Sequence, residues 1–387
     1  MRKTTFSGFI RPDGSAGIRN HVAVISTVAC ANGVAAGIAR AVPGAVPLLH
    51  AHGCGRVLEI TMHLNTLAGL GKNPNVAAAL VVGLGCETVQ ASAVAAEIAK
   101  TGKPCEHLVI QEQGGSRKTT EKGVKIARAF LEDASRIQRQ ACPLDLFTIG
   151  LECGGSDAFS GITANPAVGL VSDWLVGQGG TVILTESTEM IGTSHILSRR
   201  AKGPETAQKV EQVVAKAYKT TRDILGELAT YVIAPGNMDG GLSSISEKSL
   251  GCIAKGGSSA ITEVVDYGRS PKEKGLVIMD GPGYDAESIA ALAAAGAQLI
   301  LFTTGRGTPI GFPIVPVIKV ASTTRLYNLM EDDMDVNAGT ILEGRSLEDV
   351  ATEIRTLSLN VMNGTLSKAE QNNQGGIVCL AAMTPAF

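Results

Sequence analysis

Short apolar runs alternate with longer helix-like segments along the first third of the chain. The runs are four to seven residues long and rich in Val, Ile, Leu and Ala; they cover residues 22–27, 45–50, 77–83 and 108–111. The segments between them, up to residue 42 and at 57–70, 92–100 and 117–139, have the pattern of helices. Apolar strands of this length that alternate with helices are typical of a parallel sheet covered on both faces. Right-handed crossovers place the carboxyl ends of such strands along one edge.

The pattern restarts after residues 140–143, which predicts a boundary between a first domain, 1–141, and a second, 142–387. Strands are expected at 144–151, 181–185, 275–280, 298–303 and 314–320, and helices at 165–177, 205–227 and 346–362. Residues 235–257 are rich in Gly and Ser and are expected to be a loop that helps to form a site. The predicted fold class is α/β, with two Rossmann-like parallel-sheet domains and the site between them.

Composition narrows the function classes. The chain has 387 residues, of which 44% are hydrophobic and 18% charged, and its net charge of −2 includes no block of like charges. Neither nucleic acid nor a membrane surface is therefore an expected partner. No apolar run is long enough for a membrane span, and the N-terminus lacks the apolar core of a secretory signal. The eight cysteines do not have the dense spacing of a disulfide scaffold, so a cytoplasmic, reduced protein is expected.

Polar and reactive side chains follow six of the predicted strands. The six loops are HAHGCGR (50–56), GLGCETVQ (83–90), QEQGGSRKT (111–119), LECGGSDAFSGITANP (151–166), TESTEMIG (185–192) and TGRGTPIG (304–311). Functional groups in open α/β sheets gather beyond the carboxyl ends of strands. The coincidence at six strand ends therefore indicates an active or binding site.

Three of these loops contain a cysteine next to a glycine, at Cys54, Cys86 and Cys153. Their polar neighbours are His50, His52, Glu87 and Glu152. Thiolates near imidazole and carboxylate groups can hold iron or zinc, and the three loops together favour a metal site. The alternative is that each cysteine is a small buried apolar residue, since the spacing matches no zinc ribbon or ferredoxin. Four cysteines outside these loops are expected to be structural: Cys30, Cys105, Cys142 and Cys379.

Two further segments carry candidate catalytic groups. In TESTEM, Glu186 and Glu189 would lie on one face of a helix. They could act as a general base or as metal ligands. The alternative is that the helix dipole favours two carboxylates at the start of a helix. The segment SEKSLGCIAKGG places Lys248 ahead of Cys252 and Lys255. Arg306, between two glycines, suits a substrate carboxylate, unless it is a solvated surface residue. Structural roles are expected for His21, His63, His107 and His195.

Six blocks resemble one enzyme family: GFIRPDGSAGIRNH, GLGCETVQ, ECGGSDAFSGITANPAVG, TESTEMIG, GGLSSISEKSLGCIAKGG and TGRGTPIGFPIVPVIK. Together they resemble the altronate/galactarate dehydratases, a family that includes the large subunit of sulfolactate sulfo-lyase. The resemblance implies a lyase that depends on a divalent metal, usually iron, and eliminates water or sulfite from a 2-hydroxy acid. It also implies that the small SAF-type domain of the sugar-acid members is missing here. A small SAF-type partner subunit and a homo-oligomer of large subunits are therefore expected.

The resemblance leaves two branches open. Residues at six positions are similar to those of the sulfo-lyase large subunit: His50, Cys153, Asp157, Asn165, Glu186 and Glu189. The thiols at Cys54 and Cys86 and the segment SDAFSG are instead similar to those of the sugar-acid dehydratases. A sugar acid of the altronate or galactarate type is the first choice of substrate, and sulfolactate is the alternative.

The expected reaction is β-elimination through an enediolate, which gives a 2-keto-3-deoxy acid. The expected ligands of Fe²⁺, Mn²⁺ or another divalent ion come from the set His50, Cys54, Cys86 and Cys153. Glu186 or Glu189 would be the base or a further ligand, and His52 or Lys248 would protonate the departing hydroxyl. Substrate hydroxyls would bind to Ser156, Asp157 and Asn165, and carboxylates to Arg19 and Arg306. Two alternatives stay open: an iron–sulfur cluster on Cys54, Cys86 and Cys153, and a non-catalytic subunit that binds sugar acids.

Overall fold

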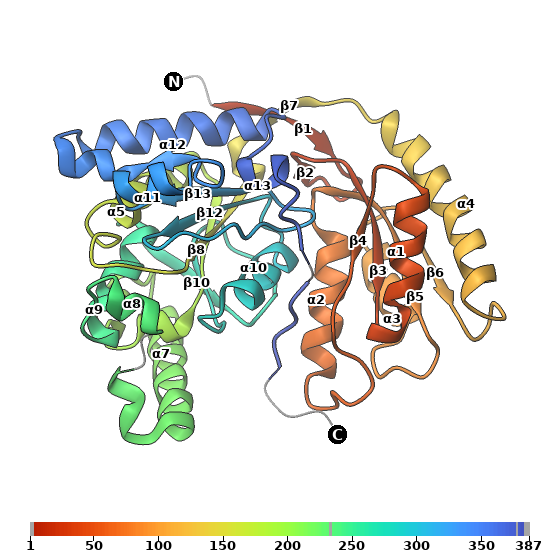
Figure 1. Ribbon diagram of the computed structural model, residues 1–387, viewed down its shortest axis with the longest axis horizontal. Helices are drawn as coiled ribbons and strands as arrows, with labels where there is room; N and C mark the ends of the chain where they lie inside the picture. Colours follow the sequence, from red (N-terminus) through yellow and green to blue (C-terminus); the bar gives the residue numbers. More distant parts are fainter. Residues whose placement is uncertain (1–3, 232–233, 377, 383–387) are drawn as a thin grey trace.

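Two parallel sheets and one small antiparallel sheet form the frame of the protein (Figure 1). The computed structural model describes residues 4–231, 234–376 and 378–382. The first parallel sheet has the strand order β4-β3-β5-β6, and its strands are β3 (His21–Ser26), β4 (Ala45–Leu48), β5 (Val76–Gly83) and β6 (Cys105–Val109). All eight residues of β5 are buried, which explains why this strand is an unbroken apolar run.

Apolar side chains of the first sheet alternate between its two faces, so helices cover both faces. Val24 of β3 packs with α1 (Asn32–Ala41) and α4 (Ser116–Ser135), whereas Ala23 and Ile25 face α2 (Ile60–Lys72) and α3 (Ala91–Ala99). In Figure 1 this half of the molecule, in red and orange, lies beside the half that contains the second sheet.

The second parallel sheet has seven strands in the order β10-β11-β9-β8-β12-β13-β14. They are β8 (Thr148–Cys153), β9 (Thr181–Leu184), β10 (Ile261–Val265), β11 (Gly275–Met279), β12 (Leu299–Thr304), β13 (Val317–Ala321) and β14 (Val336–Asn337). One face shares a core with α5 (Ala164–Gly177) and α12 (Leu347–Met362), and the opposite face packs on α10 (Asp285–Ala294). Strand β8 is the first strand of this sheet in the sequence and lies between β9 and β12, so later strands are added on both sides of it.

The remaining elements connect or flank the sheets. Strand β1 (Thr5–Ile10) pairs antiparallel with β2 (Ala16–Gly17) and with β7 (Gln140–Pro143). Strand β7 belongs to the segment of the chain that connects the two parallel sheets. The other helices are α6 (Ser194–Leu197), α7 (Pro204–Leu225), α8 (Pro235–Asp239), α9 (Ile245–Ile253), α11 (Thr324–Leu329) and α13 (Lys368–Gln371). The C-terminal segment returns to the first sheet, where Val378 N donates to Leu49 O over 2.8 Å.

The two halves are joined by a common core and by buried asparagines. Helices α2 and α10 pack against each other, one from each half. The Asn75 side chain is completely buried; its Oδ1 accepts from Ile18 N over 2.9 Å, and its Nδ2 donates to the carbonyls of Gln298 and Ile314, each over 3.0 Å. One amide therefore connects the first sheet to the strand β12 region of the second.

Replacement of Asn75 with alanine should lower the free energy of unfolding by about 2–3 kcal/mol, because several buried backbone groups lose their partner at once. Chemical denaturation followed by circular dichroism measures this loss. The exposed Asn328, replaced in the same way, is the control and should change stability by less than about 0.5 kcal/mol. Equal stability of the two variants would contradict a joining role for Asn75.

The α/β fold class with two parallel sheets is confirmed, and most predicted strands and helices are found close to their expected bounds. Two segments differ. Residues 144–146 form a 3₁₀ turn ahead of β8, and the expected loop at 235–257 contains the helices α8 and α9. None of the described helices is long and apolar enough to cross a membrane.

Candidate active site

The site lies where the second sheet changes its direction of growth. Strands β8 and β12 are neighbours, but the chain leaves β8 toward β9 on its other side. The loops after β8 and β12 meet here: Gly154 N donates to Thr303 O over 3.2 Å, and Arg306 N donates to Gly155 O over 2.7 Å. Such switch points are the usual place for ligands in open α/β sheets.

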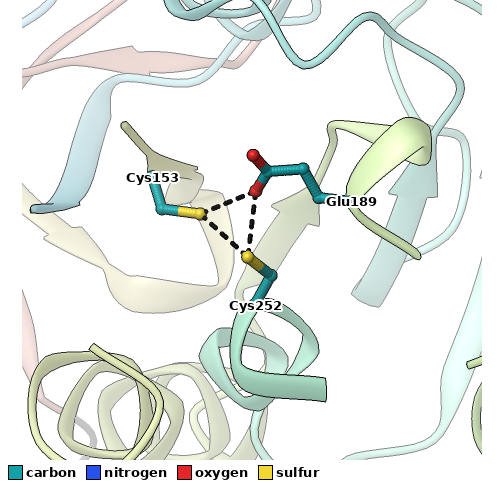
Figure 2. A group of neighbouring side chains, drawn as sticks. All are labelled: Cys153, Glu189 and Cys252. Atoms are coloured by element: carbon teal, nitrogen blue, oxygen red, sulfur yellow. Dashed lines mark hydrogen bonds between the residues drawn. The ribbon is translucent and has the colours of Figure 1, made fainter. Parts of the chain in front are cut away.

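Two thiols and a carboxylate meet beyond the end of β8 (Figure 2). Cys153 Sγ lies 2.9 Å and Cys252 Sγ 3.0 Å from Oε2 of Glu189, and the two sulfur atoms are 3.4 Å apart. All three residues are buried, and their donor atoms lie within 4.8 Å of one another. We call these three residues the thiol cluster.

Each member of the thiol cluster comes from a different local structure. Cys153 ends β8 and shares the α5 face of the sheet with Leu151. Glu189 lies in a 3₁₀ turn, Ser187–Met190, directly after β9. Cys252 belongs to α9, and the hydroxyl of Ser244, the N-cap residue before this helix, accepts from Glu247 N.

Two lysines on the same helical surface neutralise the carboxylates. Lys248 Nζ contacts Glu189 Oε1, and Lys255 Nζ lies 2.9 Å from Glu186 Oε2. The same oxygen of Glu186 accepts from Cys153 N over 3.1 Å. Lys248, Cys252 and Lys255 are spaced by four and three residues, which places them on one side of α9 and the turn that follows it.

The protonation states follow from this pairing. Burial raises the pKa of Glu189, but Lys248 and Lys255 outweigh that effect and leave the pKa lowered. Burial lowers the pKa of Lys248, yet the Glu189 carboxylate holds it above its usual range. Burial raises the pKa of Cys153. At neutral pH the site thus holds a carboxylate, an ammonium group and protonated thiols that a metal ion would deprotonate on binding.

The donor set of the thiol cluster fits a divalent transition metal. Thiolate sulfur and carboxylate oxygen are ligands of iron and zinc in proteins, and three ligands leave positions open for a substrate. Two sulfur atoms and one oxygen from three separate segments lie close enough to bind one metal ion together.

A cavity of about 270 Å³ adjoins the thiol cluster. Its lining includes Cys252 and Lys248 together with Ser156, Asp157 and Asn165. The Ser156 Oγ is buried and has no hydrogen-bond partner among the described residues. The structure therefore brings three of the expected substrate-binding residues to a space beside the thiols.

Asp157 and Asn165 also hold the cavity wall in place. Asp157 accepts from Ser160 and Ser322 hydroxyls over 2.7 and 2.8 Å. Asn165 donates to Gly251 O over 3.0 Å and accepts from the Thr303 hydroxyl over 2.6 Å. These contacts fix the loop after β8 against α9 and β12.

The other expected metal ligands lie in the first half of the molecule. His50 Nε2 contacts Ser26 O over 2.9 Å and its Nδ1 accepts from His52 N, so both ring nitrogens are engaged in the buried, neutral imidazole. Burial lowers its pKa to about 4. Cys54 and Cys86 are exposed, and Thr88 connects their loops by donating to Cys54 O. Within the described ranges, Cys153 thus meets Glu189 and Cys252 and not the expected His50, Cys54 and Cys86.

Three further candidates do not line the cavity beside the thiol cluster. His52 Nε2 contacts Leu380 O over 2.9 Å. Arg19 forms a two-point ion pair with Glu370 and donates to the carbonyls of Ile18, Val361 and Thr365, so its guanidinium is a structural clamp. Arg306 follows β12, is 47% exposed in its side chain and lies 3.9 Å from Asp239.

The pattern of strand ends did not assign Cys252 and Lys255, although both stand in a segment singled out for Lys248. Their spacing from Lys248 is the signal that would have found them once the segment is treated as a helix. Asp285, which lies near Glu152 and Glu186, has no comparable signal in the sequence.

Two family models match the chain. Residues 144–384 match the family described as D-galactarate/Altronate dehydratase, C-terminal, and residues 8–135 match D-galactarate dehydratase/Altronate hydrolase, second domain. The chain belongs to the galactarate/altronate dehydratase family. The resemblance inferred from the sequence is therefore confirmed, and with it the expectation of a dehydratase-like enzyme.

Members of the galactarate/altronate dehydratase family resemble the chain over nearly its whole length. It is 37% identical to the altronate dehydratase of Bacillus subtilis, over 95% of this chain and 76% of that protein. It is 35% identical to the galactarate dehydratase (L-threo-forming) of Escherichia coli, over 99% of this chain and 77% of that protein. It is 33% identical to the (2R)-sulfolactate sulfo-lyase subunit beta of Chromohalobacter salexigens, over 96% and 95% of the two chains.

Proposed function

We propose that this protein eliminates water from a sugar acid of the altronate or galactarate type and releases a 2-keto-3-deoxy acid. Family membership supports the reaction class. The observation that carries the proposal is the thiol cluster beside a cavity lined by hydroxyl, carboxylate, amide and ammonium groups. Polar groups of this kind suit a polyhydroxylated acid.

Cys153, Cys252 and Glu189 would hold the metal ion, with Fe²⁺ as the first choice and Mn²⁺ or another divalent ion as the alternative. Such an ion supplies the positive charge that makes a weakly acidic hydrogen beside a carboxylate removable. With its Oε2 on the ion, Glu189 is also the stronger candidate base of the two expected glutamates, through its Oε1, which contacts Lys248 at the cavity. Glu186 is paired with Lys255 behind Cys153.

Lys248 is the proton donor in this proposal, in place of His52. Its ammonium group lines the cavity and contacts Glu189. Transfer of its proton to the departing hydroxyl produces water, and the proton that Glu189 has taken from the substrate carbon returns to Lys248 through their contact. Each turnover thus moves one proton from carbon to the leaving oxygen and restores both side chains.

Replacement of Ser156 with alanine should raise KM about tenfold and change kcat little, because a buried hydroxyl without a protein partner suits a hydrogen bond to a substrate hydroxyl. Steady-state kinetics with the best substrate measures the effect. Replacement of Ser135, an exposed residue of α4, with alanine is the control. An unchanged KM would remove Ser156 from the proposed substrate contacts.

The decisive experiment is a screen of the anaerobic, Fe²⁺-loaded protein against aldonates, aldarates and sulfolactate. Formation of a 2-keto-3-deoxy acid supports the proposal, and formation of sulfite and pyruvate supports the sulfo-lyase alternative. That alternative is kept because the chain matches the sulfo-lyase subunit beta along 95% of that protein's length. Activity that survives Cys153→Ala and Glu189→Ala would favour the non-catalytic binding subunit.

A small partner subunit is also proposed. The similarity to a relative named as a subunit supports it. Co-expression with candidate small SAF-type polypeptides, followed by co-purification and the same screen, tests whether a partner is needed for turnover. Size measurement of the purified complex tests the expected homo-oligomer of large subunits.

A further inference from the structure

A second group of metal-seeking atoms lies on the opposite face of β8 from the thiol cluster. Glu152, Glu186 and Asp285 each place a carboxylate oxygen within 4.8 Å of the others. Glu152 precedes Cys153 in the strand, so the two side chains point to opposite faces of the sheet, and Glu152 meets Ser288 of α10. We call these three residues the carboxylate cluster.

Two oxygen atoms of this cluster accept no hydrogen bond from a protein N–H or O–H donor in the described residues. Oε1 of Glu152 and Oε1 of Glu186 are buried and make no hydrogen bond in the part of the chain that the structure describes. Both glutamate residues are completely buried, although each second oxygen is bound: Glu152 Oε2 by the Ser288 hydroxyl, and Glu186 Oε2 by Lys255 and Cys153 N. A buried carboxylate oxygen without a donor is costly, so these atoms point to a ligand.

The backbone also brings the third carboxylate close. A Cβ atom at Gly154 would lie 2.0 Å from Asp285 Oδ2, so the Asp285 carboxylate rests against the loop after β8 where a side chain would block it. Glu186 itself has a φ of 68°, a left-handed conformation rare for a residue other than glycine. Strain of this kind persists where the surroundings hold a functional group in position.

Carboxyl groups outnumber ammonium groups in this interior. Four carboxyl groups gather on the two sides of β8, at Glu152, Glu186, Glu189 and Asp285, whereas Lys248 and Lys255 pair only with Glu189 and Glu186. Within the described residues, Glu152 and Asp285 form no ion pair, so a divalent cation at the carboxylate cluster would be their positively charged partner.

We infer that the carboxylate cluster is a second cation site, specific for a hard divalent ion such as Mg²⁺, Mn²⁺ or Ca²⁺. Oxygen ligands about 2.1–2.5 Å from such an ion lie about 3–5 Å from one another, which matches the observed grouping. The thiol cluster offers sulfur to a softer metal on the other face. Glu152 and Cys153 are consecutive in β8 and face opposite sides of the sheet, so each side binds a different kind of metal. The ion at the carboxylate cluster holds the Glu186 turn and Lys255 in place.

Binding of Mn²⁺ to the full-length protein tests this inference directly. In the Cys153→Ser/Cys252→Ser variant, which lacks the thiols, one equivalent of Mn²⁺ should still bind, as measured by equilibrium dialysis and by electron paramagnetic resonance. Addition of Glu152→Gln to this variant should weaken Mn²⁺ binding at least 100-fold. Glu273→Gln, which changes an exposed carboxylate, should leave it unchanged.

A second readout separates loss of the site from loss of the fold. Co²⁺ bound to the intact thiols of the Glu152→Gln single variant should keep its sulfur-to-cobalt charge-transfer absorption. If that variant does not fold, Ser288→Ala, which removes only the hydroxyl donor to Glu152, should weaken Mn²⁺ binding about tenfold. Absence of Mn²⁺ binding to the thiol-free protein would overturn the inference and would indicate a proton shared between Glu152 and Glu186. Neither result depends on turnover, so the proposed dehydration is tested separately.

Discussion

Replacement of Cys252 with serine should lower kcat for the elimination about 1,000-fold, the size of effect seen when a major source of transition-state charge stabilisation is removed. The serine oxygen is a harder and less acidic donor than sulfur, so the thiol cluster would lose one of two thiolates. Iron content after anaerobic loading should fall in parallel. Both quantities are measured on the same preparation, by product formation and by metal analysis.

The matched control for Cys252 is Cys30→Ser, which changes an exposed thiol outside the thiol cluster and should keep full activity and iron content. A Cys252→Ser enzyme that retains iron and turns over normally would contradict the assignment of the thiol cluster as the metal site. Retained iron with lost activity would place the metal elsewhere and leave Cys252 a role in contact with the substrate.

Replacement of Lys255 with methionine should lower the free energy of unfolding by about 3–5 kcal/mol, because removal of one partner of a buried ion pair leaves the other charge uncompensated. The Lys255 side chain is 1% exposed and its Glu186 partner is completely buried. For a cooperative unit of 150–250 residues, this corresponds to a fall in Tm of about 6–20 °C. Differential scanning calorimetry of the metal-free protein measures it.

Lys125→Met, at an exposed position of α4, is the control for Lys255 and should leave Tm within about 2 °C of the parent. If Lys255→Met melts at the parent temperature, the buried pair of Lys255 with Glu186 does not stabilise the folded protein.

The sheets were predictable from the sequence because buried parallel strands are unbroken apolar runs, as β5 is at every position. Helix α10 was not predicted, although seven of its residues are buried, because a helix with apolar residues on most sides lacks the amphipathic spacing that marks a surface helix. The antiparallel pairing of β1 with β7 joins segments more than 130 residues apart, and no local pattern indicates it.

The sequence could predict the meeting of site residues only where they stand at the strand ends of one sheet. Cys153 ends strand β8 and Glu189 follows the neighbouring strand β9, so the rule of carboxyl ends brings them together. Cys54 and Cys86 obey the same rule in the first sheet, and the sequence does not say which strand ends of two sheets share a site. Cys252 reaches the thiol cluster from α9, whose position depends on packing against the turn after β9 and against α5.

The contact between the Cys153 and Cys252 sulfurs, 3.4 Å apart, has a practical consequence for handling the enzyme. Without a bound ion, these two thiols need to approach by only about 1.4 Å to form a disulfide, with dissolved oxygen as the oxidant. Preparations stored in air should therefore lose two titratable thiols together with their capacity for iron. Dithiothreitol followed by fresh ferrous salt should restore the thiols and the capacity for iron. Loss of activity in a sample stored in air would therefore reflect oxidation of the thiols and not the lack of an enzymatic activity.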